Sequence, residues 1–453
     1  MSSALPPRPR PAFPGRRLGF GTSLALILGN TVGVGIFLTP GEVAHASPDV
    51  ATYLALWVLG GLMAAAGAQV FAELGALFPR AGGDYVFLDR AFGRPVAVAW
   101  GLLSVLFSFP GSIAALAVGA AATLEATTFG GFLGVPLLQV GEWTLAGREL
   151  VALVAVGLLA AVNCRGVRWT GRTQKFLAWT PIALFLLMAL WAVFEGWIVP
   201  GGVPDVASLP AVPDPAAPSP VAPSLSLKSL AAASCAIFFT FSGWNVLTYM
   251  GGEVKTPGRT IPLAILAGVG LTVALYLLLN TAFLAVLGLP GVGSVPNAGV
   301  ATARHLLGDT GADGFAVVMV MVILAGLNAT LMAGSRIAMA VGADGYLWPR
   351  LAEVHPRRDT PIVAILAQAG LSAVLLLTGS FSFLVTVTGA VMILLSCVTV
   401  ATIFVFRRRM GLKPRAAIPG YPVTPVVFLA VGGLVLGTGM VSGGPWSLVG
   451  LAA

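Results

Sequence analysis

Long apolar stretches separated by short polar connections run through almost the whole sequence. A membrane-spanning helix needs about 20 mostly apolar residues to cross a hydrocarbon core of about 30 Å. Eleven such stretches follow one another, so the pattern predicts an all-α integral membrane protein with about eleven spans. The predicted spans cover residues 20–45, 52–78, 96–123, 148–164, 175–198, 229–251, 262–288, 315–342, 361–379, 382–406 and 421–440.

The composition excludes the main alternatives to a membrane protein. Of the 453 residues, 57% are hydrophobic and only 9% are charged, whereas soluble proteins carry about 25% charged residues. A disordered chain would instead combine low hydrophobicity with high net charge. The cysteines Cys164, Cys235 and Cys397 match no disulfide framework and no metal-binding motif. We therefore expect no metal and no cofactor.

The basic residues are distributed unevenly between the connections. If the spans alternate from a cytoplasmic N-terminus, the outer side receives only Arg148, Lys228 and Arg304 of the 25 Lys and Arg residues. Arg336 falls near the cytoplasmic end of the eighth span, and all the others lie in the cytoplasm. This bias sets the orientation of membrane proteins. The net charge of +8 thus indicates a multi-pass protein of the cell (inner or cytoplasmic) membrane rather than a nucleic-acid-binding protein. The predominance of arginine among the basic residues suggests a bacterial source.

Two of the predicted spans contain residues that interrupt a helix. The first has Gly29, Gly33 and Gly35 in its middle, and the sixth has Ser242 and Gly243 within an aromatic run. Irregular backbone at membrane depth is tolerated only where it lines a cavity or is buried in protein. Its free amides attract an anion and its free carbonyls attract a cation. Either break alone also fits close helix packing, but breaks at matching positions of two five-span blocks indicate a transporter site for a zwitterion.

Five segments resemble the amino acid–polyamine–organocation (APC) superfamily, and within it the L-type amino acid transporter branch. They are GVGIF (33–37), AELGALFPRAGGDYVFLDRAFG (72–93), VNCRGVRWTGRTQ (162–174), FSGWNVLTYMGGEVKTPGRTIPLAI (241–265) and GLNATLMAGSRIAMAVGADGYLWPRLAEVHPRRDTPI (326–362). The resemblance extends from about residue 18 to 410. It implies the LeuT-like APC fold, a five-plus-five inverted repeat with broken helices 1 and 6 that works by alternating access.

This fold divides the chain into five parts. We expect a cytoplasmic tail (1–17), a first repeat with spans one to five (18–198), a proline-rich extracytoplasmic loop (199–228), a second repeat with spans six to ten (229–410), and span eleven with a short C-terminus (411–453). The family commonly has twelve spans, so this chain is expected to have one fewer.

The resemblance also implies roles for residues at the two breaks. The carboxylate of the substrate rests on amides of the first break, and its ammonium group is held by carbonyls of Thr31, Phe239 and Ser242. Phe239 matches the gating aromatic above the substrate, and Trp244 and Asn245 match a pair that shapes the site. In the third span, Ser108 and Ser112 are expected to face it. The predicted substrate-binding residues are Thr31, Val32, Gly33, Val34, Gly35, Ile36, Phe239, Thr240, Phe241, Ser242, Gly243, Trp244 and Asn245.

The sequence predicts a neutral pocket for the substrate side chain. An ionisable residue at mid-depth in a membrane is a functional candidate by default. The acidic residues near the spans fall at span ends or cytoplasmic turns, and Arg336 is expected to reach the cytoplasmic surface by snorkelling. We therefore expect transport of neutral L-amino acids. These acidic residues are Glu42, Glu73, Glu125, Glu195 and Glu253.

Ion coupling is where the chain departs from its family. Pro181 stands where many members carry a helix-five lysine. Asn328 and Ala329 stand where sodium-coupled relatives have two hydroxyls, with Thr330 one residue out of register. These departures predict sodium-independent exchange or facilitated transport. An ion-coupled (proton or sodium) symporter and a transporter of amines or polyamines remain alternatives. No cluster of catalytic residues indicates an enzyme, and we expect the amino acid and membrane lipid as partners of a monomer or homodimer.

Overall fold

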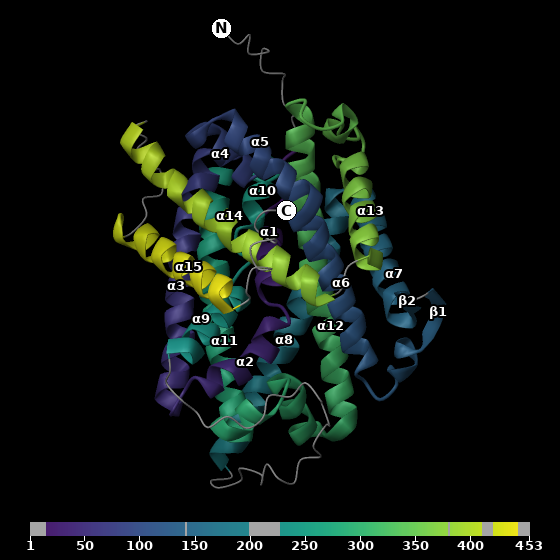
Figure 1. The fold of residues 1–453 in the computed structure, drawn as a ribbon, viewed down its shortest axis with the longest axis vertical. Helices are drawn as coiled ribbons and strands as arrows, with labels where there is room; N and C mark the ends of the chain where they lie inside the picture. The colour runs from purple at the N-terminus through teal and green to yellow at the C-terminus, as the bar shows by residue number, and fades with distance from the viewer. Residues whose placement is uncertain (1–14, 141–142, 199–226, 379–380, 410–419, 443–453) are drawn as a thin grey trace.

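Long helices lying side by side form most of the protein (Figure 1). The computed structural model describes residues 15–140, 143–198, 227–378, 381–409 and 420–442. The predicted N-terminal tail and the proline-rich loop therefore lie largely outside the described residues, and the C-terminal segment 411–453 lies partly outside them.

The helices and strands are numbered in the order in which they follow one another along the chain. They are α1 (Phe20–Thr31), α2 (Gly35–His45), α3 (Val50–Leu77), α4 (Asp84–Phe92), α5 (Arg94–Leu103), the π-helix η1 (Ser104–Ser108), α6 (Phe109–Glu125), the 3-10 helix η2 (Gly131–Gly134), β1 (Pro136–Val140), β2 (Trp143–Ala146), α7 (Gly147–Cys164), α8 (Val167–Ile198), α9 (Leu227–Thr240), α10 (Val246–Tyr249), α11 (Pro257–Ser294), α12 (Ala298–Ala343), the 3-10 helix η4 (Pro349–Ala352), α13 (Ile362–Thr378), α14 (Phe381–Arg409) and α15 (Val423–Ser442).

Each of the eleven predicted spans coincides with a helix or with a series of consecutive helices. In the described residues, seven helices are long and apolar enough to cross a membrane, and the bent pair α1–α2 makes an eighth. Helix α9 has 14 residues, and α13 and α15 are shorter apolar helices. A helical, membrane-spanning fold class is thus confirmed, whereas the count of eleven spans and the inverted repeat stay predictions.

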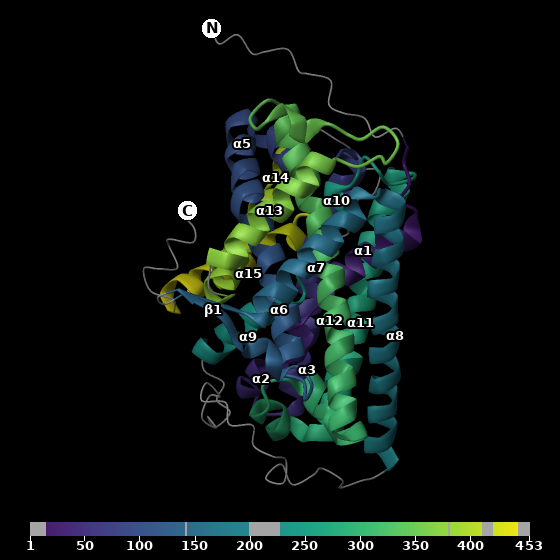
Figure 2. The same ribbon diagram turned by 90° about the vertical axis from the view of Figure 1, so that its right-hand side faces the viewer.

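Three long helices run next to one another along the bundle. Figure 2 shows α8, α11 and α12 side by side, and each contacts the other two. Helix α12 contains a kink at Gly308, whose φ of 69° is left-handed, and the predicted eighth span corresponds to the part after this kink. Helix α12 also contacts α1 and α6, so residues on it can reach the interior of the bundle.

A short antiparallel hairpin, β1–β2, lies beside α7 (Figure 1). The apolar pattern of the sequence predicted helices only. The reason for the difference is local, because the connection between the third and fourth spans carries apolar and β-branched residues over five and four positions. Segments of this length and composition favour strands over helices, and the connection is too short for another span.

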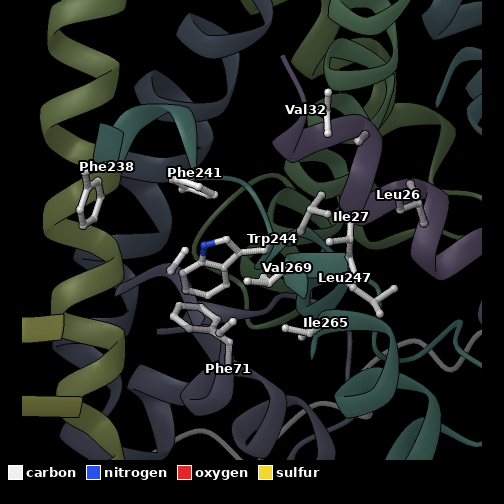
Figure 3. Packing of buried hydrophobic residues seen from close by; sticks show 14 of the residues in the cluster. Leu26, Ile27, Val32, Phe71, Phe238, Phe241, Trp244, Leu247, Ile265 and Val269 are labelled. Atoms are coloured by element: carbon white, nitrogen blue, oxygen red, sulfur yellow. The ribbon is translucent and has the colours of Figure 1, made fainter. Parts of the chain in front are cut away.

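Aromatic side chains fill the core beside the second break. Trp244 is 5% exposed and meets the ring of Phe71 edge-on, with 5.1 Å between the ring centroids. Phe241 is also buried and lies 4.9 Å from the Tyr276 ring. Figure 3 shows Trp244 directed toward Phe71 rather than into open space. These two aromatic residues therefore hold the segment between α9 and α10 against α3 and α11.

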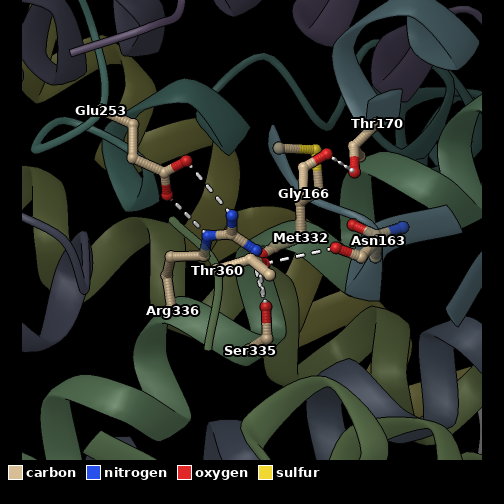
Figure 4. A network of polar contacts seen from close by, with 8 residues as sticks. All are labelled: Asn163, Gly166, Thr170, Glu253, Met332, Ser335, Arg336 and Thr360. Atoms are coloured by element: carbon tan, nitrogen blue, oxygen red, sulfur yellow. Dashed lines mark hydrogen bonds and ion pairs between the residues drawn. The ribbon is translucent and has the colours of Figure 1, made fainter. Parts of the chain in front are cut away.

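A buried ion pair corrects the expectation for Arg336. Its guanidinium binds Glu253 through Nε to Oε1 at 2.7 Å and through Nη2 to Oε2 at 3.2 Å (Figure 4). Both side chains are only 1% exposed, so Arg336 does not snorkel to the surface. The expectation that Arg336 reaches the cytoplasmic surface is therefore wrong. The sequence could not show that residues 83 positions apart would meet, and two-point hydrogen bonding offsets the cost of burying both charges.

Candidate substrate-binding site

The first break separates α1 from α2, whose axes differ by 46°. Helix α1 ends at Thr31 because Val32 adopts an extended conformation. Helix α2 begins at Gly35, and the amides of Phe37 and Leu38 bond to the carbonyl of Val34. The amides of Gly35 and Ile36 precede these bonds and have no acceptor within the helix. The start of α2 can therefore receive an anionic group, as the glycines of this segment suggested.

The second break spans residues 241–245, between α9 and α10. Gly243 has a φ of +104°, a conformation that side chains with a Cβ rarely adopt. A Cβ at this position would lie 2.4 Å from the carbonyl oxygen of Asn30. Position 243 thus requires glycine for two reasons. The backbone turn needs a positive φ, and the close approach of α1 leaves no room for a Cβ.

Asn30 connects the two breaks to each other and to α12. Its Nδ2 donates to the carbonyl of Gly243 at 2.9 Å, and its Oδ1 accepts from the hydroxyl of Thr330 at 3.1 Å. Sequence reasoning missed Asn30, although it stands directly before the predicted carboxylate-binding segment.

Tyr276 of α11 is a second connection that the sequence did not reveal. Its hydroxyl lies 2.8 Å from the carbonyl oxygen of Thr31 and 3.0 Å from that of Thr240. It therefore joins the last residues of α1 and α9, the helices that end at the breaks. A buried tyrosine usually finds a partner for its hydroxyl, but nothing local in the sequence points to carbonyls so distant along the chain.

A cavity of about 210 Å³ lies between the two breaks. Five of the thirteen predicted binding residues line it, namely Val34, Phe239, Ser242, Gly243 and Asn245. The lining also includes the expected Ser108 and Ser112, together with residues that were not predicted. These include Asn30, Asp84, Phe109, Tyr249 and Thr330.

The other eight predicted residues do not line this cavity. Gly35 faces α9, since a Cβ on it would meet Thr240 Oγ1 at 2.8 Å, whereas a Cβ on Gly33 would meet no atom within 4 Å. The remaining six residues are buried in the protein, namely Thr31, Val32, Ile36, Thr240, Phe241 and Trp244.

The three carbonyls expected to hold the ammonium group differ in their present partners. The carbonyl of Phe239 accepts from both the amide and the hydroxyl of Ser242, at 3.0 and 2.7 Å. The carbonyl of Thr31 accepts from Tyr276. Among the described residues, none donates a backbone hydrogen bond to the carbonyl of Ser242. Ser242 therefore offers the freest acceptor of the three. Phe239 is 47% exposed, so its ring does not close the cavity in this structure.

Asp84 places a carboxylate on the cavity wall that sequence reasoning overlooked. It is the first residue of α4, and its side chain is 2% exposed. Its Oδ2 accepts from the Tyr249 hydroxyl at 2.6 Å, while its Oδ1 has no hydrogen-bond partner in the described residues. Burial raises the pKa of Asp84 to about 7, although the Tyr249 hydrogen bond acts in the opposite direction. The only hint was its place in the GGDY motif after the second span.

The raised pKa of Asp84 predicts a specific pH dependence of stability. Helix α4 is not among the spanning helices. Between about pH 4 and pH 7 the unfolded chain ionises this carboxylate while the folded protein keeps it protonated, so stability falls as pH rises through this window and levels off above it. We expect the melting temperature of Asp84→Asn to fall less between pH 5 and pH 8 than that of the wild type. Asp309→Asn, which alters a carboxylate that is 76% exposed, serves as control, and equal pH profiles for all three proteins would contradict the assignment.

A network of neutral amides occupies the region of Asn328. The Nδ2 of Asn163 donates to Asn328 Oδ1 at 2.7 Å, and Asn328 Nδ2 donates to Gln174 Oε1 at 2.7 Å. Gln174 in turn donates to the carbonyl of Ala25 at 3.2 Å. These amides are buried, and they link α7, α12, α8 and α1. The side chain of Asn328 is thus occupied by structural hydrogen bonds.

Comparison with known proteins decides the family. A family model described as amino acid permease matches residues 18–445. The chain belongs to the amino acid permease family. Its members are transporters, so the chain is a multi-pass membrane transporter with an amino acid as its small-molecule substrate, and it is not an enzyme. The resemblance to the APC superfamily and its L-type branch is thereby confirmed.

Several curated proteins are similar to this permease over most of their length. The serine/threonine exchanger SteT of Bacillus subtilis is 27% identical over 448 residues, covering 96% of this chain and 95% of its own. The human large neutral amino acids transporter small subunit 2 is 27% identical over 409 residues, covering 88% and 71%. The human Asc-type amino acid transporter 1 is 29% identical over 430 residues, covering 92% and 76%.

Proposed function

We propose that this permease carries neutral L-amino acids by alternating access, as a sodium-independent exchanger or facilitator. The cavity between the two helix breaks is the proposed binding site, and this observation carries the proposal. The amides at the start of α2, beside Val34 on the cavity wall, would receive the carboxylate of the substrate. The carbonyl of Ser242, on the opposite break, would receive its ammonium group.

The lining of the cavity supports a neutral side chain. Between the breaks the lining is polar but uncharged, with Asn30, Ser112 and Thr330, and it is apolar around Phe109. Asp84 is engaged with Tyr249 on α10 rather than with either break. An amine or polyamine would need a carboxylate beside its cationic groups. The relatives named as exchanger of serine and threonine and as transporters of large neutral amino acids fit the same class.

The amide network supports transport without sodium. A sodium ion is held by several oxygen ligands, and the side-chain oxygen of Asn328 already accepts from Asn163. Pro181 lies within α8 at the position of the family lysine. The chain therefore has neither the lysine nor the free sodium ligands of related transporters. Asp84 favours proton-coupled symport as the second candidate, because a buried carboxylate near neutral pKa can exchange a proton during transport.

The orientation proposed from the basic residues places α4, η4 and the α7–α8 turn in the cytoplasm. The protein would then lie in the cell membrane with its N-terminus inside. We propose a monomer or a homodimer.

Two measurements test this function. A thermal-shift screen with the twenty amino acids should show stabilisation by a set of neutral ones, since a ligand that binds only the folded state stabilises it by mass action. Proteoliposomes loaded with such an amino acid should then exchange it equally with and without gradients of sodium or protons. Strict dependence on sodium would contradict the proposal. Strict dependence on a proton gradient would establish the second candidate instead, and stabilisation by cationic amino acids alone would contradict both.

A further inference from the structure

A second cavity, of about 290 Å³, lies at the end of the bundle where α7 turns into α8. It is separate in its lining from the proposed amino acid site. Three segments of the chain meet around it. They are the stretch before α1, the α7–α8 turn with the first turns of α8, and the loop between η4 and α13. Six arginines are among its lining residues, namely Arg17, Arg165, Arg168, Arg172, Arg357 and Arg358.

The positive charge of these six arginines is far larger than the negative charge of the carboxylates that pair with them. Asp359 pairs with Arg17, and in the part of the chain that the structure describes no other carboxylate forms an ion pair with the six. Arg358 is held by a hydrogen bond to the carbonyl of Cys164 at 3.2 Å, and Arg172 lies 5.5 Å from the centre of the Trp169 ring. Like charges repel when they are gathered around one cavity, so an anion between them would be stabilised.

The backbone is also shaped to bring these side chains together. Gly166 has a φ of +120°, and a Cβ on it would lie 2.7 Å from the carbonyl oxygen of Arg358. Only glycine therefore lets the η4–α13 loop approach the α7–α8 turn so closely. The carbonyl of Gly166 accepts from the amide and hydroxyl of Thr170 at 3.1 and 3.2 Å (Figure 4). This fixes the first turn of α8, whose free amides add to the positive potential of the arginines.

We propose that this cavity binds the phosphate group of an anionic ligand, either the headgroup of an anionic phospholipid or free phosphate. Guanidinium groups bind phosphate oxygens through paired hydrogen bonds and stay charged at every physiological pH. Trp169 at its rim is 54% exposed, as expected of an aromatic residue at the interface of a bilayer. The bound anion holds three segments together, and one of them leads directly into α1.

The link to α1 gives the bound anion an effect on the whole protein. Next to Arg17, the amide of Leu18 donates to the carbonyl of Glu253, and its carbonyl accepts from the amide of Lys255. The stretch before α1 is therefore attached both to the arginine cavity and to the segment after α10. An anion in the cavity is expected to raise the stability of the folded protein.

The test compares a cavity variant with a matched control. Arg165→Gln/Arg168→Gln/Arg357→Gln removes three charges that line the cavity. Arg80→Gln/Arg90→Gln/Arg259→Gln removes three charges from the same proposed face that do not line it, and the arginines of both sets are exposed. The melting temperatures of both variants and the wild type are measured in nanodiscs of phosphatidylcholine alone, in the same nanodiscs with inorganic phosphate, and in nanodiscs containing phosphatidylglycerol. Tryptophan fluorescence reports unfolding.

We expect phosphatidylglycerol or inorganic phosphate to raise the melting temperature of the wild type and the control by a few degrees and to leave the cavity variant nearly unchanged. A response to phosphatidylglycerol alone identifies a lipid site, and a response to inorganic phosphate in the neutral nanodiscs identifies a site for free phosphate. An equal response of both variants would assign the effect to surface charge and overturn the proposal, as would a wild type that responds to neither anion. Because the readout is stability and needs no amino acid, these outcomes do not depend on the proposed transport activity.

Discussion

Gly243→Ala is expected to lower amino acid exchange at least about tenfold, because residues forced into disfavoured backbone conformations cost of order 1–3 kcal/mol each. The φ of +104° disfavours any residue with a Cβ. The added methyl group would also lie 2.4 Å from the carbonyl oxygen of Asn30. The second break must then shift away from the first, and the hydrogen bond from Asn30 to Gly243 is lost. Exchange by proteoliposomes and binding in the thermal-shift assay both measure the effect.

Gly270→Ala is the matched control for this substitution. Gly270 lies in α11, and a Cβ on it would meet no atom within 4 Å. This variant should exchange amino acids as the wild type does. Normal exchange by Gly243→Ala would show that the contact between the breaks is not needed for binding.

Arg336→Met is expected to destabilise the protein by about 3–5 kcal/mol, since it leaves the buried carboxylate of Glu253 without its partner. Glu253→Gln should destabilise it comparably, because it leaves the guanidinium group unpaired. The double variant Arg336→Met/Glu253→Gln removes both charges and should be more stable than either single variant. Thermal unfolding of the four proteins measures this double-mutant cycle. Additive losses in the double variant would show that the two groups contribute independently.

The helices and their breaks could be predicted from the sequence because their causes are local. Apolar stretches of the right length define the helices, and glycines such as Gly243 permit the turns between half-helices. The β1–β2 hairpin was missed since its two strands are too short for a clear alternating pattern. The overall family could also be recognised, because its motifs are contiguous segments.

The contacts that join the breaks could not be predicted in the same way. Asn30 meets Gly243 across 213 positions, and Tyr276 meets Thr31 across 245. Such pairings depend on how helices pack and leave no periodic signal. Asp84 was missed for a related reason, since a carboxylate in a connecting segment looks exposed until neighbouring helices cover it.

The surroundings of Gly35 are a further contact between helices that its sequence neighbours do not reveal. A Cβ on Gly35 would meet Thr240 Oγ1 at 2.8 Å. A larger residue at position 35 would therefore push α2 away from α9, and loss of binding would follow from this separation.

The position of a bound amino acid tests the central claim most directly. A structure of the protein with a neutral amino acid that stabilises it should show the ligand in the cavity between the breaks. Its carboxylate should face the amides at the start of α2, and its ammonium group should face the carbonyl of Ser242. An amino acid bound outside this cavity, or with its two charged groups reversed between the breaks, would contradict the account.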